Sequence, residues 1–175
     1  MQQEFPERLF MVERKGKLGL GTAYIAGFKW ALQRGYEYVF EMDADFSHNP
    51  NDLPRLYKAC HEEGADVSIG SRYVSGVNVV NWPMGRVLMS YFASKYVRFI
   101  TGLPIHDTTA GFVCYRRKVL ETIHLDHIRF KGYAFQIEMK FTAFKCGFHI
   151  TEVPVIFINR ELGTSKMNSS IFGEA

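Results

Sequence analysis

An alternation of apolar runs and helical segments between residues 8 and 73 constrains the fold of this chain most strongly. RLFMV (8–12), YEYVFEM (36–42) and ADVSIGSRY (65–73) are short, apolar and rich in β-prone residues, which predicts three strands. Helical segments separate these strands. Strands that alternate with helices are typical of βαβ units, so the sequence predicts an α/β fold built on a parallel sheet.

The two helices of this region have recognisable ends. The first ends near Gly35, because glycine readily adopts the left-handed conformation that closes a helix. The second runs through LPRLYKACHEE, with Asn51 or Asp52 as its predicted cap and Gly64 as its end.

The second half of the chain continues the alternation. Apolar residues at helical spacing predict a helix over 84–102, and 133–147 is a helix that ends at a glycine. Between them, 106–123 combines a polar loop, a short strand and a short helix. The last strand, 148–160, contains Pro154, which predicts an edge or bulged strand because proline cannot donate to a ladder.

Size and composition exclude several classes of protein. The chain has 175 residues, which suits one domain over 1–175, and a hydrophobic content of 47% predicts a globular protein. A net charge of +3 does not indicate nucleic-acid binding. No apolar run approaches the ~20 residues that span a bilayer, so any membrane contact is expected to be peripheral. We expect the chain to lack the first strands and the tail of a complete domain.

Three cysteines are scattered along the sequence. Cys60, Cys114 and Cys146 show neither a CxxC pair nor a Cys/His spacing, so a zinc site is not expected. Their odd number and separation predict reduced, buried thiols in the cytosol.

The stretch FEMDADFSHNP places three carboxylates at the end of the 36–42 strand. Glu41, Asp43 and Asp45 repel one another at this spacing, which predicts a cation beside them. Asp43 and Asp45 are two residues apart, so on an extended chain they point the same way and can share Mg²⁺ or Mn²⁺ with phosphate oxygens. The alternative is a capped loop with exposed acids.

Polar and basic residues follow the other strands. Arg72 comes directly after the 65–73 strand, where it can pair with Asp43 or hold a phosphate through two N–H groups. Arg86 and Ser90 lie one helical turn apart and can form a second phosphate contact or a solvated face. Arg160 and Lys166 lie in a polar loop that can fold over a bound anion or remain solvated.

Six motifs occur in one order: RKGKLGLGTAYIAGF, FEMDADFSHNP, DVSIGSRYVSG, DTTAGFVCYRRKVLE, YAFQIEM and RELGTSKM. From about residue 12 to about 170 the chain resembles the family 2 glycosyltransferases, most closely those that transfer mannose to polyprenyl or dolichyl phosphate. The resemblance implies a three-layer GT-A (Rossmann-like) fold with a mostly parallel sheet and GDP-mannose as donor. The family's N-terminal segment, which contacts the nucleotide base, has no match here.

The resemblance also assigns roles to residues of the acidic motif. Asp43 and Asp45 match the family's metal-binding DxD, and Ser47 stands where some relatives have an additional metal-ligating Gln. Mg²⁺ or Mn²⁺ is the implied cofactor. Asp45 is expected to carry catalysis together with Arg72 and Arg86.

For the basic residues, the resemblance implies two phosphate sites. Arg72, Arg86 and Ser90 match residues that hold the phosphate of the lipid acceptor, and Arg160 and Lys166 match a loop that closes over the donor diphosphate. The implied reaction is inverting transfer of a sugar to a polyprenyl phosphate. Glucose or another sugar remains an alternative, and so does a non-catalytic piece that binds lipid phosphate or a partner subunit.

Two further alternatives concern the enzyme class and the membrane. Phosphatases of the haloacid-dehalogenase type also carry a DxD after a strand, although FSHNP followed by SRY fits their pattern poorly. A lipid acceptor implies an enzyme at the cytoplasmic face of the membrane. The aromatic residues of the 84–102 helix, with Arg98, can approach that surface, but core packing is expected for most of them: Tyr91, Phe92, Tyr96 and Phe99.

Overall fold

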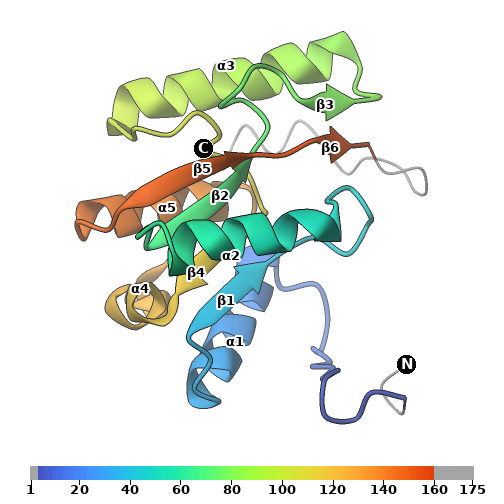
Figure 1. Ribbon diagram of the computed structural model, residues 1–175, viewed down its shortest axis with the longest axis vertical. Helices are drawn as coiled ribbons and strands as arrows, with labels where there is room; N and C mark the ends of the chain where they lie inside the picture. Colours follow the sequence, from blue (N-terminus) through green and yellow to red (C-terminus); the bar gives the residue numbers. More distant parts are fainter. Residues whose placement is uncertain (1–3, 160–175) are drawn as a thin grey trace.

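The computed structural model describes residues 4–159 of the chain, shown as a ribbon in Figure 1. The described elements, in chain order, are α1 (Leu20–Gln33), β1 (Tyr38–Glu41), the 3₁₀ turn η1 (Pro50–Asp52), α2 (Leu53–His61), β2 (Val67–Ser71), β3 (Val79–Val80), α3 (Met84–Thr101), β4 (Val113–Arg116), α4 (Arg117–Thr122), the 3₁₀ turn η2 (Leu125–His127), α5 (Ala134–Lys145), β5 (Ile150–Pro154) and β6 (Phe157–Ile158).

The central sheet has four strands in the order β1-β4-β2-β5. β4 is antiparallel to both β1 and β2, and β5 is parallel to β2. β1, β2 and β5 therefore run in one direction and β4 runs against them, which confirms the predicted α/β fold with a mostly parallel sheet. The carboxyl ends of β1, β2 and β5 meet at one edge.

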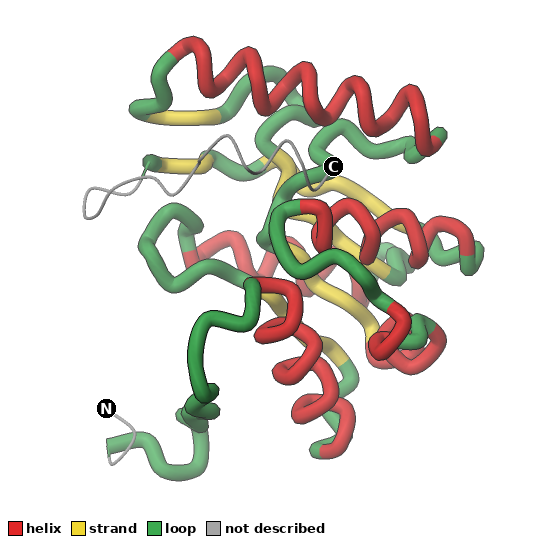
Figure 2. Tube along the Cα trace, turned by 180° about the vertical axis from the view of Figure 1, so that it is seen from behind, coloured by secondary structure: helices red, strands yellow, loops and turns green. Residues whose placement is uncertain are grey.

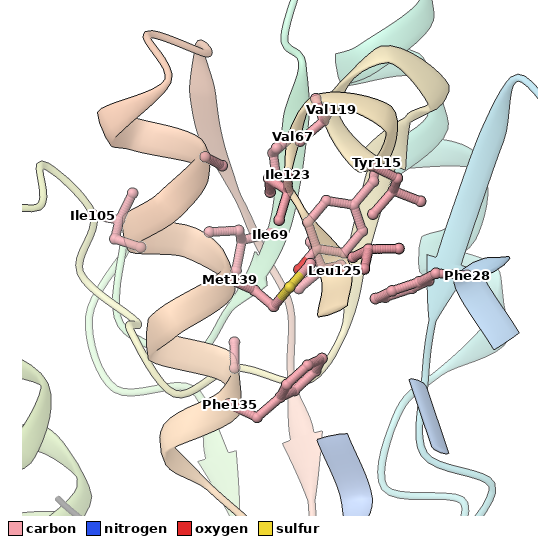
Figure 3. Packing of buried hydrophobic residues seen from close by; sticks show 14 of the residues in the cluster. Phe28, Val67, Ile69, Ile105, Tyr115, Val119, Ile123, Leu125, Phe135 and Met139 are labelled. Atoms are coloured by element: carbon pink, nitrogen blue, oxygen red, sulfur yellow. The ribbon is translucent and has the colours of Figure 1, made fainter. Parts of the chain in front are cut away.

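Helices cover both faces of this sheet, so the fold has three layers (Figure 1). On one face α1, α4 and α5 enclose a core in which Phe28 meets Tyr115 edge to face, with ring centroids 5.4 Å apart. Figure 3 shows this core, with Phe135 and Met139 of α5 pointing toward the sheet. On the other face α2 packs Leu56 against Phe112 and Cys114. Apolar residues alternate between these two cores along β4, which explains why this strand is buried on both sides.

The predicted strand at 8–12 is wrong. Residues 8–12 have no regular structure, and the side chains from Leu9 to Val12 are all exposed. Phe10 instead rests against Trp30 of α1, with ring centroids 5.0 Å apart. A strand forms only where a neighbouring strand supplies its hydrogen bonds, and within residues 4–159 none lies beside this segment.

The start of α2 and the split of the last strand follow from two residues. Asp52, one of the two predicted caps, occupies the N-cap position of α2, but its side chain makes no capping hydrogen bond. Asn49 caps the preceding η1 turn, where its side chain accepts a hydrogen bond from the Asn51 backbone N–H at 3.0 Å. Pro154 ends β5 at the sheet edge, as predicted, and the chain then forms β6 beside β3.

α3 lies at one end of the molecule, with β3 and β6 between it and the rest of the fold (Figures 1 and 2). The core packing expected for most of its aromatic residues is wrong: the exposed fractions are 59% for Phe92, 67% for Tyr96 and 87% for Phe99. Only a narrow face of the helix meets the domain, and Ser94 is its one fully buried residue. No helix within residues 4–159 is long and apolar enough to cross a membrane.

The three cysteines are free thiols, as predicted. Cys60 and Cys114 are buried between α2 and the sheet, whereas Cys146 is exposed at the end of α5, so its predicted burial is wrong. α5 ends at Lys145, and Cys146 therefore lies in the turn that leaves the helix, on the surface.

Candidate active site

A cavity of about 150 Å³ lies at the edge where the carboxyl ends of the parallel strands meet. Open α/β sheets place ligand sites at this edge, where loops diverge and side chains converge. The cavity brings together five of the predicted site residues with the loop after residue 107 and parts of α3, α5 and β6. Its lining consists of Leu20, Asp43, Asp45, Ser47, His48, Gly70, Arg72, Trp82, Arg86, Thr109, Ala110, Gly111, Tyr133, Gln136, Phe157 and Asn159.

Hydrogen bonds fix the two aspartates in the loop after β1. The Tyr24 hydroxyl donates to Asp43 Oδ1 at 3.0 Å, and the Ser47 hydroxyl and backbone N–H donate to Asp45 Oδ1 at 2.5 and 3.1 Å. Burial, followed by the nearby Asp43 carboxylate, raises the pKa of Tyr24 well above its ordinary value. Tyr24 therefore stays protonated and acts as a donor that orients Asp43.

The donor set at this loop fits a hard divalent cation. Asp43, Asp45 and Ser47 offer only oxygen atoms, and both carboxylates line the cavity. Within residues 4–159 no cluster of three or more His, Cys, Asp or Glu residues forms a complete metal cage. Two carboxylates with remaining positions open to water or phosphate are the usual protein share of a Mg²⁺ site. Ser47 donates to Asp45, so it also holds this ligand in place.

Arg72 forms its ion pair with Asp107. The alternative of a pair with Asp43 is therefore wrong. Its Nε and Nη2 donate to the two Asp107 carboxylate oxygens at 2.6 Å each, and Nη2 also donates to Thr109 Oγ1 at 2.9 Å. Burial opposes the charge of Asp107, but the adjacent Arg72 guanidinium holds the pKa of this carboxyl below its ordinary value. The arrangement fixes the Arg72 guanidinium in the cavity wall.

Arg86 reaches the same cavity from α3. Its guanidinium carbon lies 3.9 Å from the centre of a Trp82 ring, and Nη1 donates to Asn159 Oδ1 at 3.2 Å. Ser90, one turn further along α3, lies beside Tyr73 and is not part of the cavity lining. The structure thus brings Arg72 and Arg86 together and leaves Ser90 behind them.

A buried polar cluster behind the cavity was not predicted from the sequence. Glu41 is 1% exposed and accepts a hydrogen bond from the Tyr115 hydroxyl at 3.4 Å, while Lys140 and Gln136 approach from α5. Burial raises the pKa of Glu41 to about 8 despite the opposing charge of Lys140, and burial lowers the pKa of Lys140 to about 8. Of the three crowded carboxylates, Asp43 and Asp45 line the cavity, whereas Glu41 is buried behind it.

One signal for this cluster is present in the sequence. Gln136 and Lys140 are four residues apart in YAFQIEMK, so they lie on one helix face together with the buried Ala143. Polar residues on an otherwise buried face indicate a function or a buried network. The remaining predicted residues, Arg160 and Lys166, lie outside the described residues.

Comparison of the sequence with known proteins identifies its family and its relatives. Residues 1–124 match the family model described as glycosyl transferase family 2. The chain is 51% identical over 170 residues to a polyprenol monophosphomannose synthase of Mycolicibacterium smegmatis, covering 97% of this chain and 64% of that protein. It is 50% identical over 165 residues to an undecaprenyl-phosphate mannosyltransferase of Micrococcus luteus, covering 94% of this chain and 67% of that protein. The chain thus spans about two thirds of the length of these relatives.

Solved structures agree at the level of the fold. Glucosyl-3-phosphoglycerate synthase from Mycobacterium tuberculosis, in complex with phosphoglyceric acid, superposes with a TM-score of 0.58 at 18% identity, covering 93% of this chain and 52% of that one. The same enzyme in complex with UDP gives a TM-score of 0.53 at 16% identity, covering 98% of this chain and 54% of that one. These likenesses confirm the predicted GT-A fold. The chain belongs to glycosyl transferase family 2.

Proposed function

We propose that this chain transfers a mannosyl residue from GDP-mannose to a polyprenyl or dolichyl phosphate, with inversion at the sugar C1. The observation that carries this proposal is a cavity in which two carboxylates, Asp43 and Asp45, lie with two guanidinium groups, Arg72 and Arg86. Such a lining suits two anionic substrates, one bound through a divalent cation and one through arginine. The names of the two relatives favour mannose over glucose and a polyprenyl phosphate over other acceptors.

The chemistry requires little proton transfer. A phosphate monoester, with a second pKa near ~6, is largely dianionic at neutral pH, so its oxygen can attack C1 without a strong general base. The new bond joins the acceptor oxygen to C1, and the bond between C1 and the diphosphate oxygen breaks as GDP leaves. A single displacement of this kind inverts C1.

The residues of this chain have distinct tasks in that displacement. Arg72 and Arg86 offset the repulsion between the acceptor phosphate and the donor diphosphate. Because Asp107 binds the Arg72 guanidinium, Arg72 does not form an ion pair with Asp43. Asp43, Asp45 and Ser47 would hold Mg²⁺ or Mn²⁺, which when bound stabilises negative charge on the leaving diphosphate. Arg160 and Lys166 are proposed to add positive charge on the donor side.

A transfer assay tests this function directly. Purified protein, radiolabelled GDP-mannose, Mn²⁺ and a short polyprenyl phosphate are expected to give a labelled, organic-extractable product whose β-anomeric configuration shows inversion of the α-linked donor. UDP-glucose in the same assay tests the alternative donor. A protein that binds polyprenyl phosphate but transfers no sugar from any donor would instead support the non-catalytic alternative.

We further propose that α3 contacts the cytoplasmic face of the membrane, where the acceptor lies. Exposed apolar residues follow one another at helical spacing along α3, with the cations Lys95 and Arg98 among them: Met84, Leu88, Phe92, Tyr96 and Phe99. Aromatic side chains flanked by lysine and arginine are typical of helices that lie in the interface of anionic membranes. Arg86 is on the same helix, so this contact would hold the cavity near the lipid phosphate.

The membrane contact predicts a measurable loss of vesicle binding. A Phe92→Ser/Phe99→Ser variant should bind phosphatidylglycerol vesicles about tenfold or more weakly in a sedimentation assay, because binding scales with buried apolar area. Tyr36→Ser is the matched control: Tyr36 is 46% exposed but lies at the turn between α1 and β1. Equal binding by the double variant and the control would contradict this role of α3.

A further inference from the structure

Glu152 of β5 holds the start of the loop that leads into β4. Its Oε2 atom accepts a hydrogen bond from the His106 backbone N–H at 2.7 Å, and its Oε1 atom accepts one from the Asp107 backbone N–H at 2.9 Å. The His106 Nδ1 atom lies 2.8 Å from the same Oε2 atom. The Glu152 side chain is only 6% exposed and does not line the cavity. One largely buried carboxylate therefore fixes two successive residues of this loop.

Asp107 connects this loop to Arg72. Its carboxylate accepts from the Arg72 backbone N–H at 3.0 Å as well as from the guanidinium, and Thr109 of the same loop accepts from Nη2 at 2.9 Å. These contacts engage the N–H groups of Nε and Nη2, which leaves the N–H groups of Nη1 for a ligand at the cavity that Arg72 lines. The direction in which Arg72 presents Nη1 thus depends on where the loop holds Asp107.

The other end of the loop is held independently of Glu152. The Lys140 Nζ donates to the Ala110 backbone oxygen at 2.7 Å, so α5 fixes the part of the loop that lines the cavity at Ala110. Separate hydrogen bonds from Tyr24 and from within the acidic loop hold the loop after β1. Loss of the Glu152 contacts should therefore displace Arg72 and leave the rest of the cavity wall in place.

We propose that Glu152 is a positioning residue, which through His106 and Asp107 holds the Arg72 guanidinium in the orientation that binds the acceptor phosphate. The inference rests on the proposed function, because it concerns the acceptor contact of the same site. A guanidinium binds phosphate through a rigid, planar set of N–H groups, so a small rotation weakens this contact more than it would weaken that of a point charge. Because Glu152 does not line the cavity, its effect should appear in acceptor binding and not in donor binding.

The KM values of the two substrates test this role. Glu152→Gln keeps the size of the side chain, but its amide nitrogen cannot accept a hydrogen bond, so one of the two loop N–H groups loses its partner. KM for a short polyprenyl phosphate should rise at least about fivefold, while KM for GDP-mannose should stay within about twofold of the wild-type value. A variant that is only less stable contains less active protein, which lowers the maximal rate and leaves both KM values unchanged.

Asp66→Asn is the matched control. The Asp66 side chain is a mostly buried carboxylate, 13% exposed, that also accepts a hydrogen bond from a backbone N–H, that of His149 at 3.0 Å. Asp66 precedes β2, whereas Arg72 follows it, so the control lies at the end of the strand away from the cavity. Both KM values of Asp66→Asn should stay within about twofold of the wild type.

His106→Ala keeps the role testable if Glu152→Gln does not fold. It removes only the ring contact, at a side chain that is 45% exposed, and should raise KM for the acceptor alone by about two- to threefold. In an active wild type, an unchanged acceptor KM in Glu152→Gln, or in His106→Ala where the first variant is unfolded, would overturn the positioning role alone. An equal rise in both KM values would overturn it too. A wild type that transfers no sugar would overturn the proposed function and this role together.

Discussion

Replacing Asp45 with alanine is expected to lower kcat for mannosyl transfer by at least about 10²–10³-fold. Asp45 would supply one of two carboxylates to the metal that stabilises the leaving diphosphate, and it accepts both the hydroxyl and the backbone N–H of Ser47. Its loss thus removes a ligand and loosens the loop that carries the others. The measurement is initial rates of transfer at saturating GDP-mannose over a Mn²⁺ titration.

Two variants separate the metal role from the structural role of Asp45. Asp45→Asn keeps an oxygen that can accept from Ser47 but removes the negative charge, so it should lose nearly as much activity as Asp45→Ala. Asp126→Asn is the matched control, because Asp126 is exposed, pairs with Lys29 and does not line the cavity. Full activity in Asp45→Asn would rule out a metal held by the charge of this residue.

The second large effect concerns the stability of the fold. Asp107→Asn is expected to lower the free energy of unfolding by about 3–5 kcal/mol, because it leaves the Arg72 charge buried without its carboxylate partner. A loss of this size corresponds to a fall in Tm of roughly 6–20 °C for a domain of this length. Urea denaturation monitored by circular dichroism gives the value at constant temperature.

The same exposed control applies to this measurement. Asp126→Asn removes half of a solvent-exposed ion pair and should leave the urea midpoint unchanged. If Asp107→Asn unfolds at the same urea concentration as the wild type, Arg72 is not held by this pair, and its fixed position in the cavity wall needs another explanation.

Local pattern was sufficient where neighbours in sequence determine the structure. Periodicity placed α1, α3 and α5 correctly, and Pro154 indicated the edge strand before β6. The DxD after β1 could be read as a site because two residues on an extended chain share a side. These features need no knowledge of distant parts of the chain.

Features that depend on distant partners could not be predicted. Arg72 pairs with Asp107, 35 residues away, although Asp43 was also a plausible partner by charge. Residues 8–12 are β-prone, but a strand also requires a neighbour. α3 shows the helical spacing of a buried helix, yet its apolar side is exposed. Periodicity predicts that a helix has an apolar face, but it does not predict which part of the protein covers that face.

Calorimetric titration of this chain with GDP-mannose, with and without Mn²⁺, tests the central claim most directly. The account predicts binding that requires Mn²⁺ and disappears in Asp45→Ala, because the donor diphosphate would be held through the metal at the Asp43 and Asp45 carboxylates. Equal binding of GDP-mannose by the wild type and Asp45→Ala, or binding unaffected by removal of Mn²⁺, would contradict it.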